Sequence, residues 1–151
     1  MNKKVLIVFS LVALIFVSCS KETETVTVTN GSAKITGVAK CDLDLTNTER
    51  EFVPAGTKII ATIDTKDLVN NPDNAITYPE RTFTTTVGAN GVYTLTIDAN
   101  SKTVSVDIQA SDFEYDQKVN DTTFTRKVYV YGTSTRTVVE GVTVIEDIDF
   151  F

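Results

Sequence analysis

Hydrophobic and polar residues alternate with a period of two along most of the chain after Ser32, and β-branched residues dominate. Successive side chains of an extended chain point to opposite faces, so this alternation predicts β-strands, and no convincing amphipathic helix is present. We expect strands at Ala33–Cys41, Lys58–Asp64, Arg81–Val87, Val92–Asp98, Thr103–Ala110, Phe124–Tyr131 and Arg136–Phe151, the last interrupted at Gly141.

The alternation also assigns faces to four of these strands. The side chains expected in the core are Ile59, Ala61, Ile63, Phe83, Thr85, Val87, Tyr93, Leu95, Ile97, Val104, Val106 and Ile108. The opposite faces carry mostly Thr, Ser and Asp, as is typical of antiparallel sheets with one wet face. We therefore predict an all-β domain, a seven- to eight-stranded antiparallel β-sandwich.

The connections between strands divide into short and long ones. The short turns Gly88–Gly91 and Ala99–Lys102 predict that the three strands they join form a meander. The long connections are 42–57 and 65–80, and loops of that length are often functional. The second long loop supplies a candidate binding loop with the residues Asn70, Asn71, Asp73 and Tyr78.

The first residues have the layout of a signal peptide: Lys3 and Lys4 precede the apolar run Val5–Val17. This run is too short to cross about 30 Å of hydrocarbon as a helix that rises about 1.5 Å per residue. It ends in Phe16-Val17-Ser18-Cys19, which resembles the lipobox of bacterial lipoproteins. The resemblance implies cleavage before Cys19 and attachment of acyl chains, such as palmitate, to this residue.

We accordingly expect a signal peptide at residues 1–18, a lipidated Cys19 with a tether to residue 31, and the sandwich at 32–151. Two or more acyl chains make membrane anchoring stable. The segment Ser20-Lys21-Glu22-Thr23-Glu24 resembles short acidic export tags of surface-displayed lipoproteins in some diderm bacteria, and a solvated polar tether explains it equally well.

Three segments of the expected sandwich resemble transthyretin-like, carboxypeptidase-regulatory-like domains of bacterial surface proteins. They are Ile35-Thr36-Gly37-Val38, Pro54-Ala55-Gly56-Thr57-Lys58-Ile59 and Asn90-Gly91-Val92-Tyr93-Thr94-Leu95, within residues 33–110. The resemblance implies an Ig-like sandwich that works as a non-catalytic module for spacing, display or binding. It carries over no functional residue.

The composition of the chain excludes some classes of partner. The chain has 14 basic and 20 acidic side chains and a net charge of −6, and loss of Lys3 and Lys4 would make it more acidic. Such a surface repels phosphate backbones, so we expect no nucleic-acid partner. With Cys19 lipidated, Cys41 is the one remaining thiol, and near the end of a strand we expect it to be a buried hydrophobe.

The chain contains no histidine, so a Ser-His-Asp or Cys-His arrangement is excluded, and we expect no enzymatic activity. The carboxylate pairs Asp42/Asp44 and Glu49/Glu51 fall in a predicted loop without a sugar cleft. We expect no cofactor besides the lipid.

Calcium is the one metal that the sequence suggests, because Asp112, Glu114 and Asp116 place three carboxylates at alternate positions. The same alternation describes the wet side of a strand whose Phe113 and Tyr115 face inward, and this interpretation is the favoured one.

Together these features predict a lipid-anchored cell-envelope protein that serves as a non-enzymatic binding or structural accessory module. The alternatives are a fimbrial or adhesin-type assembly subunit, suggested by the final strand, and a calcium-binding surface domain. Expected partners are the membrane, through the lipid, and a glycan or an envelope protein, with Tyr78 and Phe52 as aromatic anchors. We expect an outer-membrane, surface-facing location, with a periplasm-facing orientation as the alternative.

Overall fold

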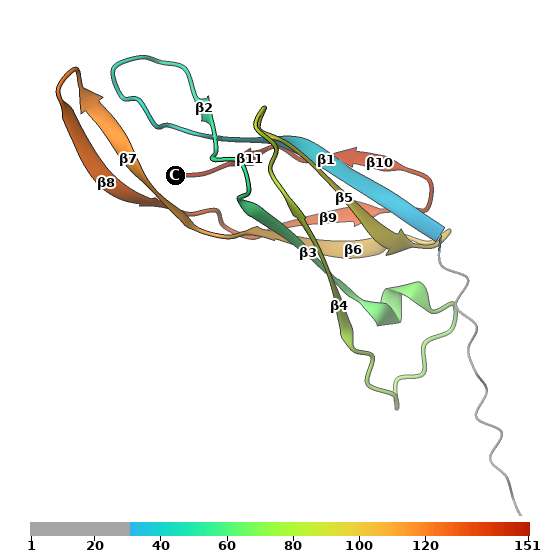
Figure 1. Cartoon of the computed structure of the whole chain (residues 1–151). Helices are drawn as coiled ribbons and strands as arrows, with labels where there is room; N and C mark the ends of the chain where they lie inside the picture. Colours follow the sequence, from blue (N-terminus) through green and yellow to red (C-terminus); the bar gives the residue numbers. More distant parts are fainter. Residues whose placement is uncertain (1–30) are drawn as a thin grey trace, which may run out of the picture.

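The computed structural model describes residues 31–151, which form an elongated all-β structure of two packed sheets and a projecting hairpin (Figure 1). Cys19 and the expected signal peptide and tether up to residue 30 lie outside the described residues. Within 31–151 no helix is long and apolar enough to span a membrane.

The first sheet is built around β1 (Gly31–Cys41). On one side β1 pairs antiparallel with β5 (Val92–Ala99) and with the short β2 (Glu51–Phe52). It also pairs in parallel with β10 (Thr143–Ile145) and β11 (Ile148–Asp149). The last residues of the sequence therefore complete the sheet that the first described residues begin.

The second sheet has the order β4-β3-β6-β9, with all neighbours antiparallel. Its strands are β3 (Lys58–Asp64), β4 (Glu80–Thr86), β6 (Val104–Ala110) and β9 (Ser134–Val138). A short 3-10 helix, η1 (Thr65–Leu68), follows β3 and buries Leu68. The two remaining strands, β7 (Phe113–Asn120) and β8 (Thr123–Tyr129), pair with each other as a hairpin and with no other strand of the described residues.

The core lies between the two sheets and confirms the predicted β-sandwich. Ile35 and Leu95 of the first sheet and Ile59, Val106 and Ile108 of the second are at most 2% exposed. The side chains predicted to face outward on β4, β5 and β6 are exposed or half-buried. Burial of alternate apolar side chains from both sheets is the main stabilising contribution to this architecture.

The predicted meander of three strands is wrong. β4 belongs to the second sheet, β5 to the first and β6 to the second again, so both short turns carry the chain from one sheet to the other. The turn Gly88–Gly91 is closed by the bonds from Gly88 N to Val92 O (2.9 Å) and from Gly91 N to Gly88 O (3.0 Å). Gly91 has a φ of 75°, a left-handed conformation that favours glycine at this bend.

A buried polar cluster ties the chain end to the second sheet. The carboxylate of Glu146, 4% exposed, accepts hydrogen bonds from Ser134 Oγ (2.8 Å) and Arg136 Nε. Its backbone oxygen accepts a bond of 2.5 Å from the hydroxyl of Tyr93, and burial raises the pKa of this phenol. The partners satisfy the buried carboxylate, so the connection between β10 and β11 is fixed in place.

Candidate functional site

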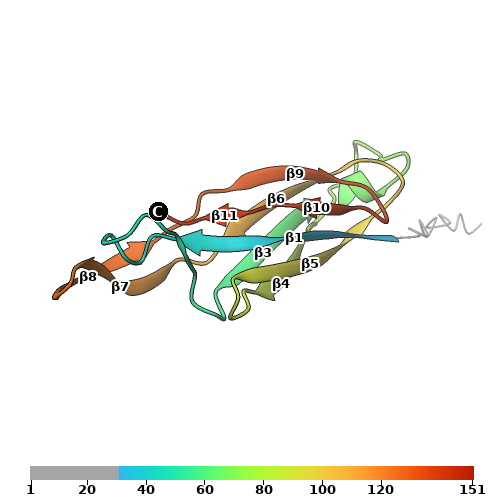
Figure 2. The same ribbon diagram turned by 90° about the horizontal axis from the view of Figure 1, so that it is seen from above.

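The β7–β8 hairpin and the loop 42–50 make up one end of the molecule, which we call the distal end. Figure 2 shows this end opposite the point where the chain enters β1. A two-stranded hairpin is marginal by itself, so its position requires contacts with the sandwich or with the neighbouring loop.

The base of the hairpin is held by aromatic packing. The ring of Phe113 stacks on that of Tyr129, with centroids 5.1 Å apart, and meets the buried Phe150 edge-on at 5.2 Å. The hydroxyl of Tyr129 donates a bond of 2.5 Å to the backbone oxygen of Asp42. Burial raises the pKa of Tyr129 to about 12, so this phenol stays protonated and keeps donating.

The loop 42–50 forms backbone hydrogen bonds with the edge of β7 that does not pair with β8. Lys118 N donates to Leu43 O (2.8 Å), and Leu45 N donates to Lys118 O (2.9 Å). The carboxylate of Glu51 accepts a bond from Leu43 N (2.8 Å). The pKa of Asp44 is lowered, chiefly by the hydrogen bond from the Thr46 side chain, with Lys118 as a further partner. The carboxylates of Glu51 and Asp44 therefore stabilise the conformation of the loop.

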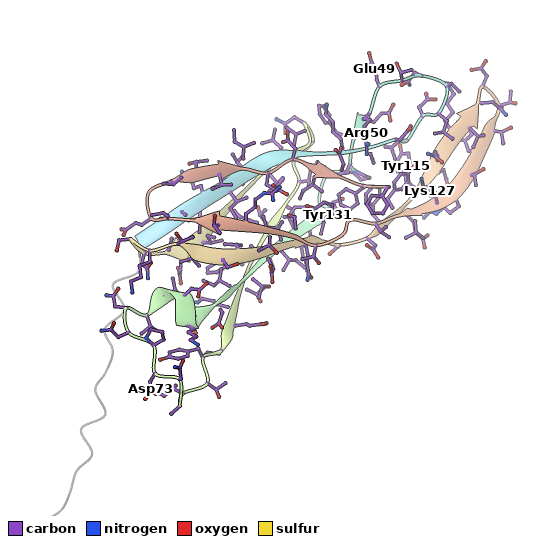
Figure 3. The ribbon with its side chains drawn as sticks, turned by 180° about the vertical axis from the view of Figure 1, so that it is seen from behind. Glu49, Arg50, Asp73, Tyr115, Lys127 and Tyr131 are labelled. Atoms are coloured by element: carbon purple, nitrogen blue, oxygen red, sulfur yellow. The ribbon has the colours of Figure 1, made fainter. Side chains whose placement is uncertain are left out.

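A shallow open pocket lies on the hairpin beyond the packed base. Its volume is about 500 Å³ and it is lined by Tyr115, Asp116, Phe124 and Arg126; we call it the tip pocket. Phe124, on the same face as Asp116 and Arg126, is 60% exposed. Tyr115 is 42% exposed, and its side chain points to the opposite face of the hairpin. Figure 3 shows Tyr115 on the hairpin, far from Asp73 in the opposite loop.

The charged groups of the tip pocket are arranged across the two strands. Asp116 lies opposite Arg126 in the register of the hairpin. Glu114 precedes Asp116 by two residues in β7, so the two carboxylates lie on the same face. The guanidinium lies 3.1 Å from Glu114 Oε2 and 3.3 Å from Asp116 Oδ1. Hydrogen bonds to Asp116 and then to Glu114 raise the pKa of Arg126, which keeps its charge at every physiological pH.

The residues predicted as a calcium site do not gather around a cation-sized space. Glu114 and Asp116 both face Arg126, while Asp112 is exposed at the hairpin base. Within residues 31–151 no group of three or more carboxylates, cysteines or histidines could hold a metal ion. Of the two side chains expected to face inward, Phe113 does so, but Tyr115 is exposed because the hairpin extends past the sandwich.

The predicted binding loop lies at the end where the chain enters β1, and it is closed by its own bonds. The backbone nitrogen of Asp73 donates to the hydroxyl of Tyr78 (2.9 Å), and Lys102 Nζ donates to Asn70 O (2.5 Å). Tyr78 is half-buried, while Asn71 is exposed. Phe52, the other predicted anchor, is 47% exposed and covers Gly91, where an added Cβ would lie 2.4 Å from its ring.

Sequence reasoning missed Phe124 and Arg126 as site residues. The signal that was present is the run of acidic residues at alternate positions before Asn120-Asp121, followed by Arg126. Read as a hairpin, this run places Arg126 opposite Asp116, which is an opposite-charge cross-strand pair.

Comparisons with known proteins find similarity in three-dimensional structure alone. No protein-family model matches the chain, and no curated protein matches it. The major plantain pollen allergen Pla l 1 has 17% identity and a TM-score of 0.35, over 79% of this chain and 92% of the allergen. At this level the likeness carries no argument about function.

Two bacterial structures match over about half of their own length. The shaft pilin SpaA from Lactobacillus rhamnosus GG has 9% identity and a TM-score of 0.42, over 81% of this chain and 51% of the pilin. A Bacteroides thetaiotaomicron protein provisionally described as polysaccharide-binding has 10% identity and a TM-score of 0.39, over 78% of this chain and 46% of that one. We draw no function from either.

Proposed function

We propose that the chain is a lipid-anchored, non-enzymatic binding module of the bacterial cell envelope that meets its ligand with the distal end. The observation that carries the proposal is the tip pocket, where Phe124 exposes its aromatic ring on the same face of the hairpin as the ion pair of Asp116 and Arg126. Exposed aromatic side chains near fixed charged groups are the usual anchors of binding sites.

The position of the tip pocket supports this role. An anchor on Cys19 would precede β1, and β1 begins at the end of the sandwich opposite the hairpin (Figure 2). The long axis of the domain would then hold the distal end away from the membrane. The loop with Asn70 and Asp73 would face the anchor instead, which makes it the weaker candidate for an external ligand.

Phe124, the aromatic residue at the pocket, contributes little to holding the hairpin. At its base Phe113 packs against Tyr129 and Phe150, whereas Phe124 is 60% exposed and makes no ring contact with the described residues. The ring of Phe124 is therefore available to a ligand and is not committed to the packing of the fold.

The proposal includes no catalytic step. Catalysis would need an acid and a base with matched pKa values, and the two pocket-side carboxylates Glu114 and Asp116 each have Arg126 as a partner. The pocket instead offers an apolar ring beside an exposed pair of opposite charges. This chemistry suits reversible binding.

Photo-crosslinking in cells tests the proposal. We would replace Phe124 in the full-length chain with the photoreactive analogue p-benzoylphenylalanine, and use the same replacement at Phe52 as the matched control. We expect an adduct from position 124 after irradiation of intact cells and none from position 52.

Two outcomes would overturn the proposal. Absence of any adduct at position 124, or equal adducts at both positions, would exclude the distal end as the binding surface. An adduct with twice the mass of the chain would indicate self-association, and would favour the fimbrial assembly alternative.

A further inference from the structure

We propose that the outer edge of β8 binds an extended segment of another protein, which adds to the hairpin as a third strand. The inference rests on the proposed function and names the class of partner for the same end of the molecule. Its basis is a row of backbone groups that point away from β7, together with exposed apolar side chains along the same edge.

The register of the hairpin determines which backbone groups of β8 point away from β7. In an antiparallel pair, residues that exchange hydrogen bonds alternate with residues whose N–H and C=O groups point to the outer sides. Lys118 bonds the loop 42–50 with both groups, so it is of the second kind, and Phe124 lies directly opposite it. The backbone groups of Phe124, and by alternation those of Arg126 and Val128, therefore point away from β7.

These outward groups have no hydrogen-bond partner among residues 31–151, and all three residues are exposed. The next residue of the same kind, Val130, exchanges two bonds of 3.1 Å with Phe151. The edge thus already holds an antiparallel partner at its base, and the outward groups of β8 continue the row towards the hairpin turn. An extended polypeptide is the ligand whose own N–H and C=O groups match such a row.

Exposed apolar side chains accompany this row. Phe124 is 60% exposed and Val128 is 51% exposed, and both lie on one face of the hairpin. At the base, Phe151 is 67% exposed. An added strand would place alternate side chains beside Phe124 and Val128, and cross-strand pairs of apolar side chains stabilise a sheet. Backbone bonds and apolar contacts therefore favour the same ligand.

The free edges of β4 and β5 lack this combination. The outward-facing residues of β4 are Glu80 and threonines, and β5 has one exposed large apolar residue, Val92. The side chains of Arg81 on β4 and Asp98 on β5 also form an ion pair between these two edges. Polar and charged side chains protect an edge from an added strand, so β8 is the better candidate.

Arg126 determines what the middle of the added strand requires. Its guanidinium lies 3.1 Å from Glu114 Oε2 and 3.3 Å from Asp116 Oδ1. The charge of Arg126 is therefore balanced within the hairpin, and the added strand needs no acidic residue opposite it. We expect an uncharged segment with apolar residues four positions apart, one beside Val128 and the other beside Phe124.

The test combines photo-crosslinking with a proline substitution. The full-length chain with p-benzoylphenylalanine at position 124 is irradiated on intact cells, with and without Val128→Pro. Proline removes the outward N–H of position 128 but no bond to β7, a change that edge strands tolerate. We expect a polypeptide in the adduct, identified by mass spectrometry after tryptic digestion, and a yield that falls about tenfold or more in Val128→Pro.

Thr84→Pro is the matched control. Val87 N bonds Thr57 O across the pair of β3 and β4, so by alternation the N–H of Thr84 points away from β3, on the free edge of β4. This variant loses an outward N–H on a different sheet, and it should leave the yield of the adduct unchanged. Circular dichroism of both proline variants identifies loss of folding as a separate cause.

Amide hydrogen exchange provides a readout that needs no substitution. A synthetic peptide with the sequence of the crosslinked segment is added to the wild-type chain in detergent. Exchange at Phe124, Arg126 and Val128 should slow about tenfold or more, because their N–H groups would enter backbone bonds. Exchange at Thr84 should not change.

Failure of this inference and failure of the proposed function differ in result. An adduct at position 124 that contains a glycan or a lipid, an equal yield in the folded Val128→Pro variant, or unchanged amide exchange would each overturn strand addition. In these three cases the distal end remains the binding surface and the proposed function stands. Absence of any adduct at position 124, or an adduct with a second copy of the chain, would overturn both.

Discussion

Gly37 allows the connection between β10 and β11 to approach the backbone of β1 closely. It lies in β1, opposite Tyr93 of β5. An added Cβ at Gly37 would lie 1.8 Å from the backbone oxygen of Glu146, the same atom that accepts the Tyr93 hydroxyl bond. The connection between β10 and β11 therefore requires glycine at this position.

Gly37→Ala should lower the free energy of unfolding by about 1–3 kcal/mol, because either the backbone of Glu146 or β1 must move. Gly132→Ala is the control, since nothing lies within 4 Å of its added Cβ, and should change stability by less than about 1 kcal/mol. Urea denaturation of both variants measures the difference. Equal stability of the two variants would contradict the close approach.

Cys41 is fully buried at the end of β1, as expected of a thiol that packs as a small hydrophobe. Burial, with Glu51 as the next contribution, raises its pKa from 9.0 to about 12. Burial disfavours the thiolate in the folded state. Cys41 therefore makes its full contribution to stability at pH values below the pKa that the thiol has in the unfolded chain. This contribution is lost as the pH rises toward 12.

We therefore expect Cys41 to resist iodoacetamide at pH 8 in the folded protein and to react after unfolding in urea, as measured by the mass of its peptide. Cys41→Ala should flatten the decline in stability above pH 9 relative to the wild type. Rapid alkylation of the folded protein would contradict the burial of this thiol.

The carboxylates Glu114 and Asp116 lead to a prediction about calcium. Both are occupied by Arg126, and a calcium ion would have to displace that guanidinium and find further oxygen ligands. Calorimetric titration with calcium should give no saturable heat, and the melting temperature should not rise. A saturable signal that disappears in Asp116→Asn would show that the calcium alternative is correct.

At the scale of elements, the hairpin depends on its base. Phe113→Ala removes the stacking on Tyr129 and the contact with Phe150, so we expect a loss of about 2–3 kcal/mol in unfolding free energy and faster proteolysis within the hairpin. Phe124→Ala, at a mostly exposed position, should cost less than about 1 kcal/mol. Equal losses would give Phe124 a structural role and weaken the binding proposal.

The strands with one wet face could be predicted from the sequence because the hydrophobic alternation reports burial directly. The range Lys58–Asp64 is observed with the same bounds, and Ile59, Ala61 and Ile63 are buried as expected. The favoured interpretation of 112–116 as a strand agrees with β7, but the sequence did not give the length of this strand or its partner. The hairpin projects into solvent, so only Phe113 of its apolar side chains packs against the core and Tyr115 is exposed.

Pairing between strands could not be predicted from local pattern. A short turn requires two strands to start close together, but Gly88–Gly91 shows that it can join different sheets as well as neighbours in one sheet. The parallel pairing of β10 with β1 joins Lys34 to Thr143, and no local signal encodes contacts at that separation. The tip pocket was missed for the same reason, because Arg126 meets Asp116 only across the hairpin.

At the scale of the whole molecule, the proposal joins an anchor at one end to a binding surface at the other. The sandwich has its buried core between these two ends and separates them along its long axis (Figure 1). The account requires the distal end to face away from the membrane that holds Cys19, and the exposed Asp121 at the hairpin turn is a natural position to probe.

The most direct measurement is labelling of Asp121→Cys in the full-length protein on intact cells with a membrane-impermeant maleimide, since Cys41 is buried and Cys19 is expected to carry lipid. The account predicts labelling at position 121 without breaking the outer membrane, acyl chains on Cys19 by mass spectrometry, and loss of membrane retention in Cys19→Ala. Labelling only after the outer membrane is broken, or an unmodified Cys19, would contradict a lipid-anchored module that displays its hairpin at the cell surface.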